Sequence, residues 1–557
     1  MSLELSDPTA EPSPAVVSVR WWPLVLIWLA CLLVLLPAVF GGFNIFDEGF
    51  IASAAMMIRR GALPIRDFYV IYGPGQYYLT ATLFSLFGED LLVSRSAHAL
   101  ILATLGATVA ASTLALVPRR ATWACGTVAA FLMGSGIATP GSGYAAVPSV
   151  LLLIWATHCV RRWADTGHAP SLMGASALVG VAGLFRWDFG VMGFLALVAS
   201  LAISGFTADR KVHIRPLMQA TVPGALLMLV SFVPFVVLGG AARWLEEVPV
   251  FLLLYFKDWR NLEFVRPHLA SLVQAVGAWH PYIASHDLSL LLMAGLPLLA
   301  GTAGLVVAIV RLHRKSGLAR PVEVQVLVLA FITLFLYNQM RVRSGFPQGY
   351  PSFVTALPLS AYLLFAARHA LGGLWQWARP VLTLACAASL LVLLATWQSD
   401  WRQSWDRSAL VPPWPRANGV RTATVPAEQL RRQDYLALLA HLRQHTQPTE
   451  PIFSGVADTS RLFVNDALLY FLVNRPSATR FIEMEPGLTN TLAGQHALID
   501  ELNALNVRTV VLLNVTANEP NNSGRSNGVH VLDKYIRQQF AESARFGAYT
   551  VMTRLPR

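Results

Sequence analysis

Asp47 and Glu48 are two adjacent acidic residues at the point where the first long apolar stretch of the sequence ends. An ionisable side chain beside membrane hydrocarbon is costly, so this position favours a function. A carboxylate there could act as a general base and take a proton from an attacking hydroxyl or amine. The structural alternative is that the pair caps a helix that starts near Phe50, because Asp is a good N-cap residue. The two residues alone leave both explanations open.

Residues that bind metals or nucleotides in other proteins occur without the spacing that such sites need. Three histidines and Asp287 lie between 268 and 287, but no HxxH or HxxxH pattern places them on one helical face. The glycines at 134–136 and 141–143 lack the GxGxxG and Walker patterns. We expect no firmly bound cofactor; a divalent metal is possible, but the ligand spacing does not support one.

The composition indicates the environment of these residues. Hydrophobic residues make up 55% of the chain, charged residues only 13%, and the mean hydropathy is +0.51. These values predict a polytopic membrane protein. The formal net charge of +11 lies in short basic clusters between apolar runs, so it reflects membrane topology and no nucleic-acid partner is expected. The four cysteines show no CxxC spacing and are expected as core thiols.

Apolar runs long enough to cross, or nearly cross, ~30 Å of hydrocarbon recur along the chain. We expect about eleven transmembrane helices within 20–398, after a disordered cytoplasmic N-terminus, 1–19, and before a soluble domain, 399–557. The runs are 20–43, 92–117, 121–138, 146–160, 171–185, 190–206, 216–240, 288–310, 321–338, 349–366 and 380–397.

Basic residues between the runs predict the orientation. If Arg20 holds the N-terminus in the cytoplasm, every loop expected on that side carries at least two Lys or Arg, as the positive-inside rule requires. An odd number of spans then places the C-terminal domain on the other side, together with two large loops, 44–91 and 241–287. The chemistry is therefore expected on the extracytoplasmic face.

Three arginines are predicted at the outer ends of spans. Arg186, with Asp188, interrupts an apolar run and is expected at the apex of a helical hairpin. The alternative for this pair is that the two side chains bind each other at the interface. Arg341 and Arg343 lie on the outer side against the positive-inside tendency, which favours a function for them.

The outer segments have a pattern of their own. In 44–91, apolar residues at helical spacing and several tyrosines predict interfacial helices, and 241–287 is expected to lie at the interface and could line a lipid-entry groove. Past 411–415, which is rich in proline, a helical pattern covers 426–445. Short apolar strands are predicted near 452–456, 480–484, 507–514 and 548–553, with helices between them. This alternation predicts a small α/β domain.

The order of motifs in the first loop resembles that of GT-C glycosyltransferases, in the branch that includes protein O-mannosyltransferases and the lipid A aminoarabinose transferase. The motifs are DEG at 47–49, GALPIRDF at 61–68, YGPGQYY at 72–78, LFG at 86–88 and Arg95. Later segments, RVR at 341–343, YFLVNRP at 470–476 and TRF at 479–481, resemble recurrent features of bacterial members.

This resemblance implies a bundle of many transmembrane helices, a sugar donor carried on a polyprenyl phosphate, and an inverting transfer with the loop acid as base. Asp47 matches that acid, and Glu48 would help to position the acceptor. The leaving phosphodiester anion needs cationic stabilisation, for which Arg186, Arg341 and Arg343 are the candidates.

The resemblance also implies a substrate loop and a cellular setting. Arg66, Asp67, Tyr69 and Tyr72 would form this loop, and a structural role for Arg66 and Asp67 is preferred to direct catalysis. The partners would be the lipid-linked donor, the bilayer, and a glycan, lipid or protein acceptor. The setting would be the extracytoplasmic face of a bacterial inner (plasma) membrane.

Two other classes of function remain alternatives. A transporter or flippase of a lipid-linked glycan would also have many spans and intramembrane charges, but it should show repeated halves and acids near the bilayer centre. Here the acids gather at the outer ends of spans, and no internal repeat is evident. A non-catalytic scaffold with an outer binding domain would leave Asp47 replaceable.

Overall fold

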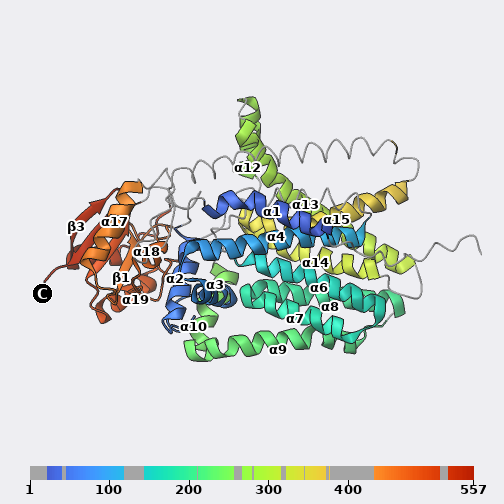
Figure 1. Ribbon diagram of the computed structural model, residues 1–557, viewed down its shortest axis with the longest axis horizontal. Coiled ribbons are helices and arrows are strands. Elements are labelled where there is room, and N and C mark those ends of the chain that lie inside the picture. The colour runs from blue at the N-terminus through green and yellow to red at the C-terminus, as the bar shows by residue number, and fades with distance from the viewer. Residues whose placement is uncertain are drawn as a thin grey trace, which may run out of the picture.

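The computed structural model describes residues 22–40, 45–117, 144–209, 211–255, 266–278, 281–314, 321–343, 345–371, 376, 432–514 and 525–556. Two parts follow one another along the longest axis: a bundle of long helices and a C-terminal domain with a sheet (Figure 1). We call the end of the bundle that meets this domain the domain end. The expected spans 121–138 and 380–397 and the expected disordered segment 1–19 lie outside the described residues.

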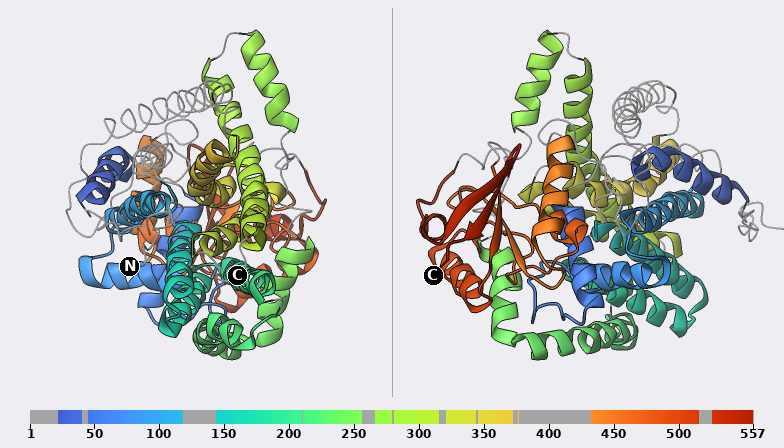
Figure 2. Two further views of the ribbon diagram at one scale, coloured as in Figure 1. Left: turned by 90° about the vertical axis from the view of Figure 1, so that its right-hand side faces the viewer. Right: turned by 60° about the vertical axis from the view of Figure 1, so that its left-hand side comes forward.

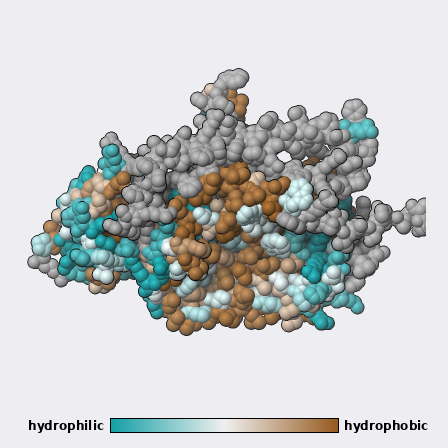
Figure 3. Space-filling model, viewed as in Figure 1, coloured by the Kyte–Doolittle hydropathy of each residue, from teal (hydrophilic) through white to brown (hydrophobic). Residues whose placement is uncertain are grey.

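The long helices coincide with the predicted apolar runs. Five of them, α4, α8, α9, α13 and α14, contain stretches long and apolar enough to cross a membrane, and α1 and α7 contain shorter ones. On the face shown in Figure 3, hydrophobic residues cover much of the bundle, whereas hydrophilic ones dominate the C-terminal domain. The predicted polytopic helical membrane protein is confirmed. The bundle helices are α1 (Trp22–Phe40), α4 (Leu91–Leu116), α6 (Ala146–Thr166), α7 (Ala169–Phe185), α8 (Trp187–Asp209), α9 (Ile214–Gly239), α13 (Pro281–Arg314), α14 (Pro321–Val342) and α15 (Phe346–Leu371).

Small residues let some of these helices approach closely, as is common where lipid replaces water as the solvent. Gly180 of α7 faces Gly224 of α9, and a Cβ added at Gly180 would lie 2.8 Å from the Cα of Gly224. Ser176 strengthens this contact, because its Oγ accepts a hydrogen bond from the Gly224 amide at 2.9 Å. The helix α14 lies among α6, α8, α13 and α15 and is buried along much of its length.

The first loop forms two helices, α2 (Asp47–Arg59) and α3 (Gly75–Phe87). The prediction of helices here is confirmed, but α2 is more enclosed than a helix lying on a membrane surface. Residues 48–56 are all buried, because α2 packs against α3 and against the helix α18 (Leu468–Val473) of the C-terminal domain. One hydrophobic cluster, with Phe50, Tyr77 and Phe471 among its members, runs across this junction.

The second large loop begins with α10 (Ala241–Leu245) and the π-helix η3 (Glu246–Tyr255), and continues with α12 (Arg266–Gly277). The helix α12 projects from the bundle, crosswise to the long helices (Figure 1 and Figure 2). It exposes Leu269, Val273 and Val276, which follow each other at helical spacing. This segment therefore presents apolar side chains away from the protein core.

The C-terminal domain carries a mixed four-stranded sheet in the order β1-β2-β4-β3. Strands β1 and β2 are parallel, whereas β2 with β4 and β3 with β4 are antiparallel. The helices pack around this sheet, so the predicted α/β domain is confirmed. Its elements are α17 (Arg432–His445), β1 (Ile452–Val456), α18 (Leu468–Val473), α19 (Leu492–Ala504), β2 (Thr509–Leu513), α20 (Val531–Gln539), β3 (Phe540–Phe546) and β4 (Tyr549–Arg554).

One predicted strand is wrong and one strand was not predicted. Residues 480–484 form no strand, because side chains satisfy much of their backbone: Asn465 donates to the Ile482 carbonyl at 3.0 Å and accepts from the Met484 amide at 2.7 Å. The missed strand, β3, is an edge strand whose residues are mostly exposed, and polar residues interrupt its apolar ones, so no apolar run indicates it.

Candidate active site

Asp47 and Glu48 point into different surroundings because consecutive residues of a helix lie about 100° apart around its axis. Asp47 is the first residue of α2 and is exposed, whereas Glu48 is 3% exposed. The N-cap position belongs to Phe46, so Asp47 is not the residue that caps the helix. The two carboxylates are adjacent in sequence, but Asp47 lies at the surface and Glu48 lies in the interior.

Glu48 is held by Arg95 in a buried, two-point ion pair. Arg95 Nε donates to Oε1 at 2.6 Å and Nη2 to Oε2 at 2.8 Å, and both side chains are almost completely buried. Arg95 Nη1 also donates to the carbonyl of Val39 at 3.1 Å. This guanidinium therefore joins α2 and α4 to the end of α1. Such fork-to-fork geometry fixes orientation as well as adding energy.

Arg186 lies at the apex between α7 and α8, as predicted, and the pairing with Asp188 is also present. Arg186 Nε and Nη2 donate to the two oxygens of Asp188, at 3.0 and 2.6 Å. Its Nη1 donates to the Tyr144 hydroxyl at 3.1 Å, and the guanidinium carbon lies 5.1 Å from the ring centre of Tyr72. Aromatic faces attract such a cation. The apex thereby contacts the first loop at Tyr72, just before α3.

The electrostatics of Tyr72 connect this apex to Asp47. Burial raises the pKa of the Tyr72 hydroxyl; Tyr144 and the carboxylate of Asp47 add to that rise, and Arg186 opposes it. The pKa of Tyr72 thus depends on both Asp47 of α2 and Arg186 of the apex. The first loop is held there by its backbone as well, because the Gly73 amide donates to the Phe185 carbonyl at 3.0 Å.

Arg341 and Arg343 lie at the domain end as well. Two residues before Arg341, Gln339 Nε2 donates to Asp188 at 3.2 Å, which ties the end of α14 to the Arg186 apex. Arg341 is exposed, and its Nε and Nη2 donate to the amide oxygen of Asn338 at 3.0 and 2.9 Å. The three candidate arginines and Asp47 therefore share one end of the bundle.

Arg66 and Asp67 close a turn of their own loop. Arg66 donates to both oxygens of Asp67, at 2.8 and 2.7 Å, and Asp67 also accepts from the Leu63 amide at 2.7 Å. These bonds from Arg66 lower the pKa of Asp67. Within this turn Ile65 has a φ of 71°, which is unusual for a β-branched residue. These hydrogen bonds hold the turn in its conformation.

Tyr69 belongs to the contact with the C-terminal domain. Its amide donates to the carbonyl of Arg480 at 2.9 Å, and its ring lies 5.5 Å from that of Phe481. Arg480 in turn forms a two-point ion pair with Glu247 of η3, with a bond of 2.6 Å from Nη2 to Oε2. Both outer loops thus meet the segment around Arg480.

Sequence reasoning missed several residues of this site. Tyr144, Phe189 and Gln339 complete the surroundings of Arg186, and the Cζ of Arg186 lies 4.4 Å from the ring centre of Phe189. Each comes from a different helix or helix end. The only available signal was closeness in sequence to a candidate arginine. Phe189 follows Arg186 by three residues, and Gln339 precedes Arg341 by two.

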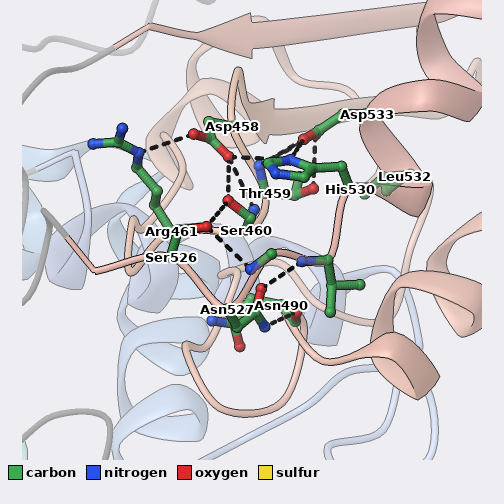
Figure 4. Close-up of polar contacts among 12 residues, drawn as sticks. Asp458, Thr459, Ser460, Arg461, Asn490, Ser526, Asn527, His530, Leu532 and Asp533 are labelled. Carbon is green, nitrogen blue, oxygen red and sulfur yellow. Dashed lines mark hydrogen bonds and ion pairs between the residues drawn. The ribbon is translucent and has the colours of Figure 1, made fainter.

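The described residues contain one group that could hold a metal: Asp458, His530 and Asp533, whose ligand atoms lie within 4.8 Å of one another (Figure 4). The group lies in the C-terminal domain, and hydrogen bonds to neighbouring side chains already explain why these residues lie close together. Asp458 accepts from Arg461 at 2.9 Å and Asp533 from Thr459 Oγ1 at 2.7 Å. Within the described ranges, neither Asp47 nor Asp287 belongs to such a group.

Comparison with known proteins gives a match at the level of structure. No family model and no curated sequence matches the chain. ArnT from Cupriavidus metallidurans in the apo state has a TM-score of 0.53 at 16% identity, over 96% of this chain and 98% of that chain. The same protein bound to undecaprenyl phosphate gives 0.50 at 14% identity, with the same coverage.

The apo oligosaccharyltransferase of Archaeoglobus fulgidus is also similar, with a TM-score of 0.50 at 13% identity over 89% of this chain and 70% of that one. Identities this low establish the fold alone. The alignments with ArnT extend over nearly the whole of both chains, from the bundle to the C-terminal domain. As the motifs of its first loop predict, this polytopic membrane protein has the GT-C fold, the fold of these glycosyltransferases.

Proposed function

We propose that the protein is a membrane glycosyltransferase that moves a sugar from a polyprenyl-phosphate donor to an acceptor on the extracytoplasmic face. The observation that carries this proposal is the position of Asp47. It is an exposed carboxylate at the domain end of a GT-C bundle, electrostatically coupled to the tyrosines around Arg186. The neighbouring structure of ArnT with undecaprenyl phosphate supports a lipid-linked donor.

Asp47 acts as the general base in this reaction. It takes the proton of an acceptor hydroxyl or amine while the acceptor oxygen or nitrogen forms a bond to the anomeric carbon. The bond from that carbon to the lipid-phosphate oxygen breaks, and the electron pair leaves on the phosphate. Attack opposite the leaving group inverts the anomeric centre. A phosphate leaving group requires no proton, so one carboxylate suffices.

Arginine side chains stabilise the departing phosphate, because a guanidinium matches phosphate geometry with two parallel N–H donors. Of the three candidates, Arg341 is the best suited: it is exposed, and the hydrogen bonds seen in the described residues join it to a neutral amide. Arg186 is committed to Asp188 and supports Tyr72 and Tyr144. We assign Arg343 to the rim of the phosphate site and Glu48 to holding α2.

The test is turnover by the full-length protein in lipid nanodiscs, supplied with a panel of polyprenyl-phosphate sugars and acceptors. Asp47→Asn should lower release of lipid phosphate by about 10²-fold or more, the usual contribution of a general base. Asp90→Asn is the matched control on the same loop, because Asp90 caps α4 and Asn caps equally well.

Wild-type turnover by Asp47→Asn would show that another group is the base. Absence of turnover with every donor, combined with movement of a fluorescent lipid-linked glycan between leaflets, would support a flippase instead. Absence of both activities would favour a scaffold.

A further inference from the structure

The beginning of α2, which carries Asp47, is bonded to the C-terminal domain on both sides of that residue. Before it, the carbonyl of Ile45 accepts hydrogen bonds from the amides of Ala467 and Leu468, at 3.0 and 3.1 Å. After it, Ser53 Oγ donates to the carbonyl of Ala467 at 2.7 Å. Ala467 and Leu468 form the start of α18.

Gly49 allows this contact to be made at backbone distance. A Cβ added there would lie 2.7 Å from the Cα of Leu468 and closer still to its amide nitrogen. The obstacle is backbone, which cannot rotate away as a side chain tip can. Gly49 is therefore required for space, and α2 must shift if any side chain is placed there.

The partner helix is itself rigidly supported. Asp466, directly before α18, is fully buried and accepts hydrogen bonds from the hydroxyls of Tyr435 and Tyr549, at 2.9 and 2.7 Å. It also accepts from the Leu469 amide at 3.0 Å. Because Tyr549 belongs to β4 and Tyr435 to α17, the start of α18 is bound to the sheet of the C-terminal domain.

The bundle holds the opposite side of the same turn. Arg95 binds Glu48 from α4 and reaches the end of α1 through Val39. The turn is thus fixed between two bodies, with Glu48 directed to the bundle and Gly49 against the C-terminal domain. Asp47 is the exposed residue next to both contacts.

We propose that α18 is a positioning element for Asp47, so that the C-terminal domain is a structural part of the active site as well as a neighbour of it. This inference rests on the proposed function, in which Asp47 is the base. Gly49, Ser53 and Leu468 are positioning residues: they touch neither substrate, and they set the place from which the carboxylate acts. Displacement of a catalytic group by about 1 Å can slow a reaction about 10²-fold.

The experiment compares Gly49→Ala with Gly174→Ala in the full-length protein in nanodiscs. Gly174 is a helical glycine of α7 with no atom within 4 Å of an added Cβ, so its substitution adds the same methyl group without a clash. We expect Gly49→Ala to lower kcat by about 10- to 100-fold while direct binding of undecaprenyl phosphate stays within about twofold of wild type. Gly174→Ala should match wild type in both measurements.

A second variant covers the case in which Gly49→Ala does not fold. Ser53→Ala removes the hydrogen bond to Ala467 without adding volume and should lower kcat several-fold, again with unchanged lipid binding. Normal kcat in both Gly49→Ala and Ser53→Ala, or in Ser53→Ala alone if the former is misfolded, would overturn the inference. Failure of the proposed function is seen separately, as wild-type turnover in Asp47→Asn.

Discussion

Arg480 of the C-terminal domain and Glu247 of the π-helix η3 form a two-point ion pair across 233 residues of sequence. This ion pair links the C-terminal domain to the second large loop. Arg480 adds a third contact, because its carbonyl accepts from Tyr69 of the first loop. Three segments that are distant in sequence therefore meet at one side chain and its backbone.

Separating this pair should loosen η3 more than it destabilises the protein. The side chains are 14% and 20% exposed, so water screens their attraction partly, and a loss of about 1 kcal/mol is expected for Glu247→Gln. Limited proteolysis should cut η3 itself faster in this variant. Glu246→Gln, at the preceding exposed position, is the control, and equal cleavage rates in the two variants would contradict the prediction.

Glu48→Gln should cause a large loss of stability, because the substitution breaks the buried two-point ion pair between Glu48 and Arg95. We expect a loss of about 3–5 kcal/mol, measured as unfolding in a denaturing detergent series. Glu89→Gln is the control: Glu89 pairs with Arg59 at the surface and should contribute at most about 1 kcal/mol. A stable but inactive Glu48→Gln variant would instead make Glu48 a catalytic group.

Asp466 predicts a pH dependence of the C-terminal domain. Burial raises the pKa of Asp466 to about 6, although hydrogen bonds from Tyr549 and Tyr435 act to lower it, and the ordinary value is 3.8. Because the folded-state pKa is the higher one, the stabilising contribution is fully present below about pH 4 and is lost as the pH rises through about 6.

Asp466→Asn removes this titration and provides the reference. The stability of the wild type relative to that variant should rise by about 2 kcal/mol between about pH 7.5 and about pH 4.5. Thermal unfolding across this range, followed through the aromatic residues, measures the difference. Parallel curves for the two proteins would show that Asp466 keeps an ordinary pKa.

Arg341 is predicted to bind the lipid phosphate. Arg341→Ala should weaken binding of undecaprenyl phosphate about 10-fold or more, because a charge-assisted hydrogen bond to an anion contributes about 1.5–3 kcal/mol. Arg341→Lys should restore the charge but not the two-point geometry, and therefore only part of the affinity. Arg59→Ala serves as the surface control. Unchanged affinity in Arg341→Ala would move the phosphate to another arginine.

Much of the fold could be predicted from the sequence, because a membrane requires apolar runs of a defined length. The runs that became α4, α8 and α14 are examples. The strands of the C-terminal domain were harder to predict. Residues 480–484 have the pattern of a strand, but the side chain of Asn465 takes the place of a neighbouring strand, and sequence patterns do not report which partner a backbone finds.

The candidate site divides in the same way. Asp47 and Arg186 stood out because charge is rare in apolar surroundings. The contacts of Glu48 with Arg95 and of Asp188 with Gln339 depend on which helices pack beside each other. The spacing of residues in the sequence does not predict this packing. Candidate residues could therefore be named from the sequence, whereas the partners that hold them in place could not.

The hydrogen bond between Ser53 and Ala467 has a consequence for the order in which this protein matures, since it joins residues 414 positions apart. At about 5–20 residues per second, a ribosome needs about 20–80 s to proceed from one to the other. Throughout that time the first loop has been made but the surface that completes it does not yet exist. Asp47 reaches its final place only when the domain that carries α18 has been synthesised and has folded against it.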